Sequence, residues 1–574
     1  MSKKAVKIIG ITLAAILVIV AGSYLYLRYH ILKSKDFAPD NSKAKSILDL
    51  TPSLIAKLKQ VVKDGSNGLY VLDINNLDVK LSENKVFISG IKISTDSLAL
   101  KLLESIKLAP DAIFNISSKS LQVDGIDLND ILNPSSIKLE NVFLIDPEIK
   151  IYSNPKPYNS KQEADTTSLY DKIYKLVPYF SASRIFIKNA QVTNYNVPKK
   201  TSQTYKGIDI YLNDILIDST TRFDRDRFFY SKNATINLKN FKIPTSDSLY
   251  FLNCDSINIS TSANSLTATG ISFQPRISKE TFNKTVNIRK DFFNIKANKI
   301  VLYSPDWWLL AQHEKLIAAE AEIFHCELSD YINKEKPAKK FELHNFPHQK
   351  LLNLDFEIGV KKIKIHDLDL TYEEYNPLSG KSGILYFTNT TGEILNFTNI
   401  QSNIAANSNM VFDVKTKFMK QSQASIKFIF NLAKPKTGDF TTEVYGSNMT
   451  ANLLNPIAEP LGMFHLKSGN VSELKMFTKG NNSGTHSKFT LKYDDLYIIP
   501  LKKDDEKDDE LKEKKFTGFI ANLLLIKKEN NSEEPRSYSY DVERGEYPNF
   551  FTLNWKAMLK GIVKTIGAPE KLAK

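Results

Sequence analysis

The sequence predicts a mostly β protein: an N-terminal transmembrane helix followed by an elongated, twisted β-sheet groove built from a tandem duplication, with a few short helices. Three observations support this fold class. An uncharged apolar run occupies residues 8–27. From Leu69 onward, short runs rich in Ile, Val, Leu, Phe, Tyr and Thr alternate with polar residues at the period of a β-strand. This strand region also matches itself at a shift of about 180 residues.

Composition indicates a folded chain. Of the 574 residues, 42% are hydrophobic and 25% are charged, so the chain can bury a sizeable core. The net charge is +13, but the lysines are scattered through strand-like segments such as Ile149-Lys150-Ile151. This scatter is typical of the solvated face of a sheet, an anionic membrane surface being the second interpretation. We therefore expect no nucleic-acid partner.

Cysteine usage excludes two further classes. The two cysteines, Cys254 and Cys326, are too few for a disulfide-dense scaffold or for a zinc site made of thiolates alone. One bridge between them is compatible with an oxidising compartment. The internal match places Cys254 opposite Ile74 and Cys326 near Ile149, which favours buried strand positions for both.

The run from Ile8 to Leu27 has the length of a helix that crosses a hydrocarbon layer of about 30 Å. It is longer than the core of a signal peptide, and Ala21-Gly22-Ser23 is followed by further apolar residues. We therefore expect an uncleaved signal anchor. The residues expected to contact the bilayer include Ile8, Leu13, Ile16, Val20 and Leu27.

Three pairs of segments, in the same order, indicate the duplication. Residues 69–93 align with 249–273 without a gap, residues 114–128 with 293–307, and residues 185–193 with 363–371. A unit of this size must itself be a sheet of several strands. The expected organisation is a signal anchor at 1–35, a helix and leading segment at 36–68, β-groove repeats at 69–245 and 246–425, a β region at 426–550, and an amphipathic helix at 551–574.

Short helices interrupt the strands. Thr51 at the N-cap and Pro52 at the first helical position predict a helix that continues to Gly65. Further helices are predicted at 168–177 and 450–459, and a turn is predicted at 344–351. The charge run at 502–515 predicts a solvated loop, and strand texture resumes at Phe516.

Each candidate motif for catalysis or ligand binding lacks a residue or a geometry that its chemistry requires. Gly380-Lys381-Ser382 lacks the first glycine of a phosphate-binding loop, because that position is Tyr375, and we interpret it as a hairpin loop. His344 and His348 have the spacing of two metal ligands on one helix, but Pro347 between them favours a loop over a metal-binding helix. Glu373 and Glu374 are adjacent on a strand and point to opposite faces, so they do not form an acid–base pair. We expect no enzyme activity, cofactor or metal.

The strand pattern itself predicts a surface. Segments such as Ile236-Asn237-Leu238 have one apolar and one polar face. Roughly 25 such strands would form a sheet about 120 Å long at ~4.8 Å per strand. Curling the sheet into a trough places the apolar side chains inside, whereas a pair of stacked sandwiches would have a packed interior. The candidate lining residues are Val71, Ile149, Ile151, Ile236, Leu238, Ile363 and Ile365.

The C-terminal segment predicts a basic amphipathic helix. It suits a membrane surface or the cap of an apolar groove, and it also suits a helix docked on the last strands. The apolar stripe includes Trp555, Met558, Leu559 and Ile562, and lysines lie beside it at Lys556, Lys560 and Lys564.

These features together resemble the AsmA family of envelope proteins. The resemblance rests on the anchor at 8–27, the helix at 51–64, the phrase NVFLIDPEIKIYSN at 141–154, the repeated strand phrases such as IKIHDLDLTY at 363–372, and residues 446–477. It implies an inner-membrane protein with a cytoplasmic N-terminus and a periplasmic β-groove. The implied role is holding or transferring phospholipid between membranes, which supports outer-membrane biogenesis and integrity.

The resemblance also implies partners: phospholipid acyl chains, the inner membrane, and envelope or outer-membrane assembly proteins. The family has no catalytic residues to carry over. The chain departs from the family pattern in its length, because a groove of this size is short for crossing an envelope alone. Two alternatives remain open, an outer-membrane protein assembly factor that receives a client strand and a non-enzymatic β-sandwich scaffold for structure or adhesion.

Overall fold

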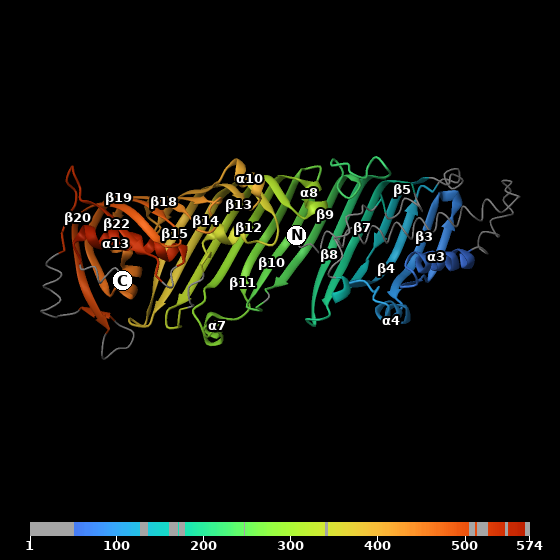
Figure 1. Ribbon diagram of the computed structural model, residues 1–574, viewed down its shortest axis with the longest axis horizontal. Coiled ribbons are helices and arrows are strands. Elements are labelled where there is room, and N and C mark those ends of the chain that lie inside the picture. The colour runs from blue at the N-terminus through green and yellow to red at the C-terminus, as the bar shows by residue number, and fades with distance from the viewer. Residues whose placement is uncertain are drawn as a thin grey trace. The chain divides into compact units, whose positions relative to one another are not determined.

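The computed structural model is mostly β, and its described strands form one mixed sheet of 22 strands rather than two stacked sandwiches (Figure 1). The expected anchor at 8–27 lies outside the described residues. Within the described part of the chain, no helix is long and apolar enough to cross a membrane. The structure describes residues 51–126, 136–159, 170–171, 178–245, 247–338, 343–503, 511–513, 526–545 and 549–568.

The chain divides into two compact units, and the division differs from the predicted one. Unit 1 runs to Ile243 and takes in residues 254–267 and 306–314. Unit 2 comprises residues 244–253, 268–305 and 315 onward. The boundary therefore lies near the predicted end of the first repeat, but unit 2 joins most of the second repeat to the C-terminal region, which had been predicted as separate.

Unit 1 begins with α3 (Thr51–Gly65), and its strands pair antiparallel except where β5 and β6 each lie parallel to β7. A parallel pair requires a crossover, which the chain makes between residues 153 and 179. The remaining elements are β1 (Tyr70–Asp73), β2 (Asn76–Lys80), η2 (Leu81–Glu83), β3 (Lys85–Thr95), α4 (Ser97–Ser105), β4 (Ala112–Asp124), β5 (Ser136–Ile145), β6 (Glu148–Ser153), η3 (Pro157–Asn159), β7 (Tyr179–Asn196), β8 (Thr201–Ile217), β9 (Ser231–Pro244) and α8 (Trp307–His313).

The strands β10 (Tyr250–Ser260) and β11 (Ser265–Pro275) contribute residues to both units, as does β9 through its last residue, Pro244. Unit 2 continues with α7 (Lys279–Thr285), β12 (Phe292–Pro305), β13 (Leu316–Asn333), α9 (Pro347–Leu352), β14 (Ile358–Asn376), β15 (Lys381–Thr398), α10 (Gln401–Ala406), β16 (Asn409–Phe418), β17 (Ser422–Asn431), β18 (Phe440–Thr450), η4 (Ala451–Leu454), α11 (Asn455–Ile457), η5 (Ala458–Gly462), β19 (Phe464–Gly480), β20 (Gly484–Lys503), β21 (Leu511–Glu513), β22 (Ser537–Glu543) and α13 (Phe550–Ile566).

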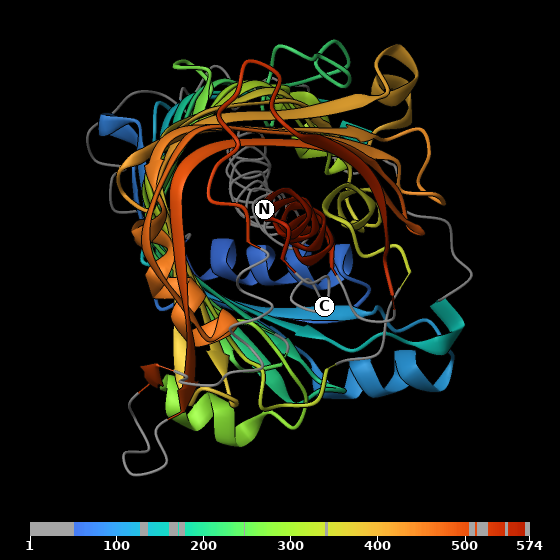
Figure 2. The same cartoon turned by 90° about the vertical axis from the view of Figure 1, so that its left-hand side faces the viewer.

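The strands of unit 2 are joined antiparallel from β14 to β20, and β13 lies parallel to β14. Figure 2 shows α13, the red helix, on the inner side of the curved strands at the C-terminal end of this unit. One face of the sheet in unit 2 is thus covered, at its C-terminal end, by a helix from the same unit.

Several predicted elements are confirmed. The helix α3 begins at Thr51 and ends at Gly65. The predicted helix at 450–459 is present as the consecutive short helices η4, α11 and η5. Gly380 lies in the tight turn that joins β14 to β15, so the hairpin interpretation is also confirmed.

Two local predictions are wrong. The predicted turn at 344–351 contains the helix α9, because the Gln349 side chain accepts from the Phe346 amide and Pro347 starts the first turn. The predicted loop at 502–515 carries strand at both ends, where Leu511–Glu513 pairs with residues 501–503. The rest of that run and the strand expected from Phe516 to residue 525 lie outside the described residues. Of the helix predicted at 168–177, only residues 170–171 are described, and they are helical.

The two aligned segments contain the same order of elements. A short helix follows β3 and β11, and parallel pairing follows in each, of β5 and β6 with β7 and of β13 with β14. Matched hydrogen bonds accompany this order: the Phe114 amide donates to the Tyr70 hydroxyl, and the Phe293 amide donates to the Tyr250 hydroxyl, both at 3.3 Å. The internal match in sequence is therefore accompanied by a match in local geometry.

Both cysteines lie on strands and are not joined by a disulfide. Cys254 is buried on β10, as predicted, and Cys326 is half-buried on β13. Burial, with a smaller contribution from the Glu327 carboxylate, raises the pKa of the Cys326 thiol.

Candidate functional site

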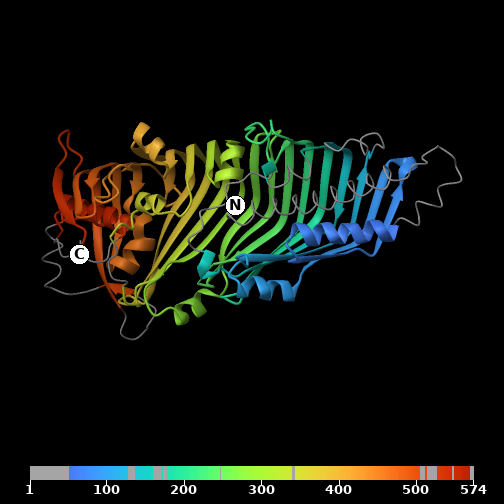
Figure 3. The ribbon, with the colours of Figure 1, turned by 45° about the vertical axis from the view of Figure 1, so that its right-hand side comes forward.

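The sheet of unit 1 carries rows of aliphatic side chains that run across successive strands on one face. Each residue in these rows is at most 5% exposed. The helix α3 adds Leu58 and Val62 to the same core, and Figure 3 shows this helix against the strands near the N-terminal end of the unit. The register gives one row as Val86, Val123, Val142, Ile185, Leu212 and Ala234, and the next as Ile88, Leu121, Leu144, Ile187, Ile210 and Ile236.

The opposite face of unit 1 is polar at the neighbouring register position. This contrast follows from the pleat, since successive residues on a strand point to opposite faces. The row that directly precedes the valine row consists of Lys85, Asp124, Asn141, Arg184, Asn213 and Asn233. Unit 1 thus has one aliphatic and one hydrated face over the same six strands.

Unit 2 repeats this arrangement over more strands. We call the face that carries the two rows given below the apolar face of unit 2. It combines buried residues, such as Met476, which is 3% exposed, with half-buried ones, such as Ile323. The first row is Leu302, Ala321, Ile363, Ile394, Phe412 and Phe428. The second row is Ile300, Ile323, Ile365, Gly392, Val414, Ile426, Val444, Met476 and Phe489.

Charged side chains occupy the other face of unit 2 between these rows. Lys364 lies 2.5 Å from a Glu320 carboxylate oxygen, and Lys427 lies 3.8 Å from Asp413. Exposed pairs of this kind are screened by solvent, so they keep the face soluble more than they stabilise it. The register row is Glu322, Lys364, Glu393, Asp413, Lys427 and Glu443.

Most of the predicted lining residues lie in apolar clusters. Ile236 and Leu238 belong to the core of unit 1 or pack against it, and Ile149 and Ile151 form an adjoining cluster that shares Ile116 with it. In unit 2, Ile363 and Ile365 occupy neighbouring rows. Val71 is only half-buried, and the next residue, Leu72, at 0% exposed, is the one in the core.

The helix α13 docks on the apolar face of unit 2, the third of the arrangements expected for it. Gly561 permits the close approach, since a Cβ there would lie 2.3 Å from the Tyr540 hydroxyl and 2.4 Å from the Phe489 ring. The Tyr540 hydroxyl donates to the Ala557 carbonyl at 2.7 Å. The helix is therefore fixed to β20 and β22 by both packing and a buried hydrogen bond.

The docking of α13 buries one part of its predicted apolar stripe and leaves another part exposed. Met558, Leu559 and Ile562 pack against the core beneath the helix, whereas Trp555 remains 38% exposed. Lys560 donates to the Asp541 carbonyl at 2.9 Å, and Lys556 and Lys564 are half-buried.

An aromatic cluster holds the start of α13. The Phe550 ring is 1% exposed, and its centroid lies 4.9–5.7 Å from those of five other rings, of which Phe551 is on the same helix and four surround Phe550 from outside it. Arg544, 2% exposed, places its guanidinium 4.2 Å from the centroid of the Phe346 ring, and burial lowers its pKa to about 10. The four rings around Phe550 are those of Phe346, Phe428, Phe430 and Phe440.

His348 lies fully buried beside this cluster, with its ring stacked on Phe430. Neither ring nitrogen has a hydrogen-bond partner among the described residues. Burial lowers the pKa of His348 to about 4, so it is neutral at physiological pH. The sequence pattern, with Pro347 next to this histidine, argued against a metal-binding helix and gave no sign of the packing role.

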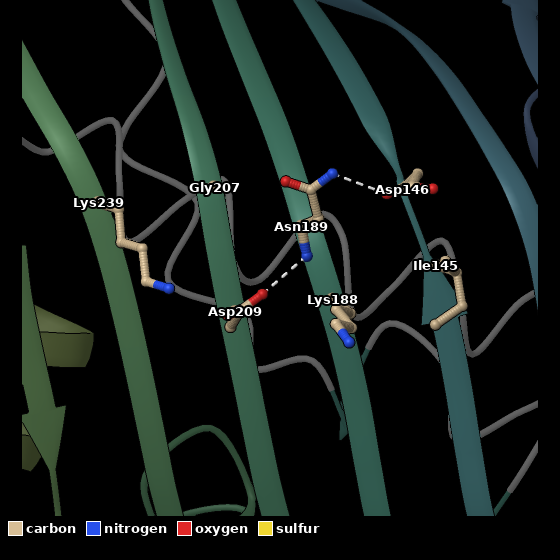
Figure 4. A pocket seen from close by; sticks show the side chains of 7 residues that line it. All are labelled: Ile145, Asp146, Lys188, Asn189, Gly207, Asp209 and Lys239. Atoms are coloured by element: carbon tan, nitrogen blue, oxygen red, sulfur yellow. Dashed lines mark hydrogen bonds between the residues drawn. The ribbon is translucent and has the colours of Figure 1, made fainter.

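An open depression on the polar face of unit 1 has a volume of about 540 Å³ (Figure 4). The Asn189 amide donates to Asp209 at 2.8 Å, and its side chain donates to Asp146 at 2.7 Å. These carboxylates, with Lys188 and Lys239 on the rim, make a hydrated site unsuited to an acyl chain.

A cluster of acids near β12, β13 and β14 was also missed by sequence reasoning. Burial, and then the Asp291 carboxylate, raise the pKa of Asp330 to about 7. Nearby, the Tyr372 hydroxyl donates to Glu374 at 2.6 Å, and Lys334 lies 2.5 Å from the same carboxylate. Across the described ranges, no group of three His, Cys, Asp or Glu residues is arranged to hold a metal ion.

Changing Asp330 to asparagine is expected to stabilise unit 2 by about 2 kcal/mol at pH 8, because the buried negative charge is removed. The raised pKa means that the wild-type protein loses stability as the pH rises from about 4 to about 7, and the variant should lack this loss. Urea unfolding at pH 5 and pH 8 measures both effects. An equal response of the two proteins to pH would contradict the assignment.

The chain was compared with protein-family models and with curated proteins, and neither comparison finds a match.

Proposed function

We propose that this chain is a membrane-anchored, AsmA-like periplasmic protein that holds or transfers phospholipid along an apolar β-groove. In this proposal residues 8–27 are the inner-membrane anchor, the two aligned segments are copies of one unit, and the role is support of outer-membrane biogenesis and integrity. The observation that carries the proposal is the continuity of the aliphatic rows across successive strands, with charged rows on the opposite face.

Acyl chains match such a surface chemically. Each buried CH₂ contributes about 0.8 kcal/mol, so rows of Ile, Val, Leu and Phe can hold a chain without a shaped pocket. The two rows of the apolar face of unit 2 contain no charged side chain, so a headgroup is best satisfied in water. Binding would thus depend on apolar length rather than on a specific contact, and movement along the rows would be diffusive.

Adjacent residues on β13 provide a matched test. Ile323 belongs to the second row of the apolar face, and Phe324, half-buried as well, points to the charged face, where it stacks on His366 at 4.4 Å between centroids. Ile323→Asp places a charge on the proposed lipid path, whereas Phe324→Asp places the same charge in water.

The full chain, purified from an envelope-bearing host into lipid-free polymer or mild detergent, is examined by native mass spectrometry and by lipid extraction. We expect phospholipid with the parent and with Phe324→Asp, and a reduction of at least fivefold with Ile323→Asp. Circular dichroism verifies that both variants are folded. Phospholipid retained equally by both variants, or absent from the parent protein, would remove the basis of the proposal.

A further inference from the structure

The helix α4 differs from every described helix of unit 1 in what it exposes. None of its residues is buried, although the helix is rich in leucine. Leu98 is 77% exposed and Leu102 is 63% exposed, followed by Ile106 at 53% and Leu108 at 67%. Large aliphatic side chains exposed singly are ordinary, but four at neighbouring positions form a patch that requires an explanation.

The geometry of the helix aligns these side chains. Asp96 caps the N-terminus, where its carboxylate accepts from the Leu98 amide at 2.8 Å and the Ala99 amide at 3.0 Å. Residues 98, 102 and 106 are then four apart, so they lie on one side of the helix. Figure 1 shows α4 beyond the ends of β3 and β4, which it connects.

The fold does not require this exposure. The helix α7 follows β11 just as α4 follows β3, and its sequence is KETFNKT. It buries Phe282 completely and leaves Lys279, Glu280 and Lys284 in solvent. A connection at this place can thus be made by a polar helix with one apolar anchor. The two exposed leucines of α4, with Ile106 at its C-cap and Leu108 just beyond, therefore serve something other than folding.

We propose that α4 lies in the headgroup layer of the membrane, with Leu98, Leu102, Ile106 and Leu108 inserted among acyl chains. Lys101 and Lys107 flank the stripe and suit anionic headgroups. The one acidic residue within the helix, Glu104, is already paired with Lys156 at 2.6 Å. This inference rests on the proposed membrane anchor, which would hold unit 1 close to the bilayer.

A protein partner fits this patch less well. Four aliphatic side chains cover a few hundred Å², whereas a stable protein interface buries about 800 Å² per partner. The stripe also has no Tyr, Trp or Arg, the residues that dominate protein interfaces. A bilayer sets neither requirement, since it accepts any aliphatic surface of sufficient depth.

The test uses the full chain in nanodiscs of phosphatidylethanolamine and phosphatidylglycerol, with Cys254 and Cys326 changed to alanine. A single cysteine at position 98, 102, 106 or 104 carries an environment-sensitive fluorophore, and lipids with a nitroxide on the acyl chain act as quenchers. Position 104 is the matched control, because Glu104 points away from the stripe. Labelling spares the fold, as α4 has no buried residue, and an unchanged thermal unfolding midpoint verifies this.

We expect blue-shifted emission and at least twofold stronger quenching at 98, 102 and 106 than at 104. Equal quenching at all four positions would overturn the proposal. A blue shift that grows with protein concentration and does not respond to the quencher would also overturn it, in favour of a second copy of the chain. Absence of co-purified phospholipid would refute the lipid-carrying function but would leave this readout unchanged, so the two failures are distinguishable.

Discussion

Replacing Phe550 by alanine is expected to lower the free energy of unfolding of unit 2 by about 3–5 kcal/mol. The ring is 1% exposed and is enclosed by Phe346, Phe428, Phe430 and Phe440. Its loss leaves a cavity where α13 meets the apolar face, and the rigid β-strands beneath cannot collapse to fill it. Chemical unfolding followed by tryptophan emission, with Trp555 on the same helix as the reporter, measures the change.

The next residue provides the control for this substitution. Phe551 has the same side chain on the same helix but is 63% exposed. Phe551→Ala should therefore cost less than about 1 kcal/mol. Similar losses for both variants would mean that α13 is not seated as described, and a small loss for Phe550→Ala alone would mean that the helix contributes little to unit 2.

Acidification is expected to destabilise unit 2 through His348. Its pKa of about 4 in the folded protein lies below the value near 6.5 of an unfolded chain. A depressed folded pKa means that the unfolded state binds the proton more tightly, so stability is full above pH 6.5 and falls as the pH drops toward 4. The difference corresponds to about 3 kcal/mol over that window.

His348→Leu should remove this pH dependence and leave stability at pH 7 unchanged or slightly higher. The ring nitrogens have no partner among the described residues, so an apolar side chain of similar size loses no hydrogen bond. Unfolding midpoints from pH 7 down to pH 4 for both proteins decide the matter. If the variant keeps the acid sensitivity of the parent, another group is responsible.

The apolar pattern of the strands could be predicted from the sequence, because a period of two is a local property. Ile236 and Ile363 are on apolar faces for this reason. The prediction of Val71 as a lining residue, where Leu72 is the buried one, shows what this local pattern cannot specify. Both residues are apolar, and only the pairing of β1 with β3 decides which one faces the core. The rows themselves depend on register across many strands, which no single segment specifies.

The helices were predicted less completely than the strands. The segment 97–105 was not predicted as a helix, because its leucines lie within a long stretch of strand texture and the Asp96 cap is a single residue. The role of His348 depends on Phe430, more than eighty residues away, and that of Arg544 depends on Phe346. Contacts between such distant positions are set by the paired sheet and have no local signature.

The row construction of each unit has a consequence for cooperativity. Each strand contributes one residue to every row, so it is held mainly by its two neighbours, as in repeat proteins whose stability is a sum of nearest-neighbour terms. Damage at one strand then weakens the adjacent pairings and leaves remote ones intact. The same additivity allows a set of strands to be duplicated as a block, because the added strands extend the existing rows and require no separate hydrophobic core.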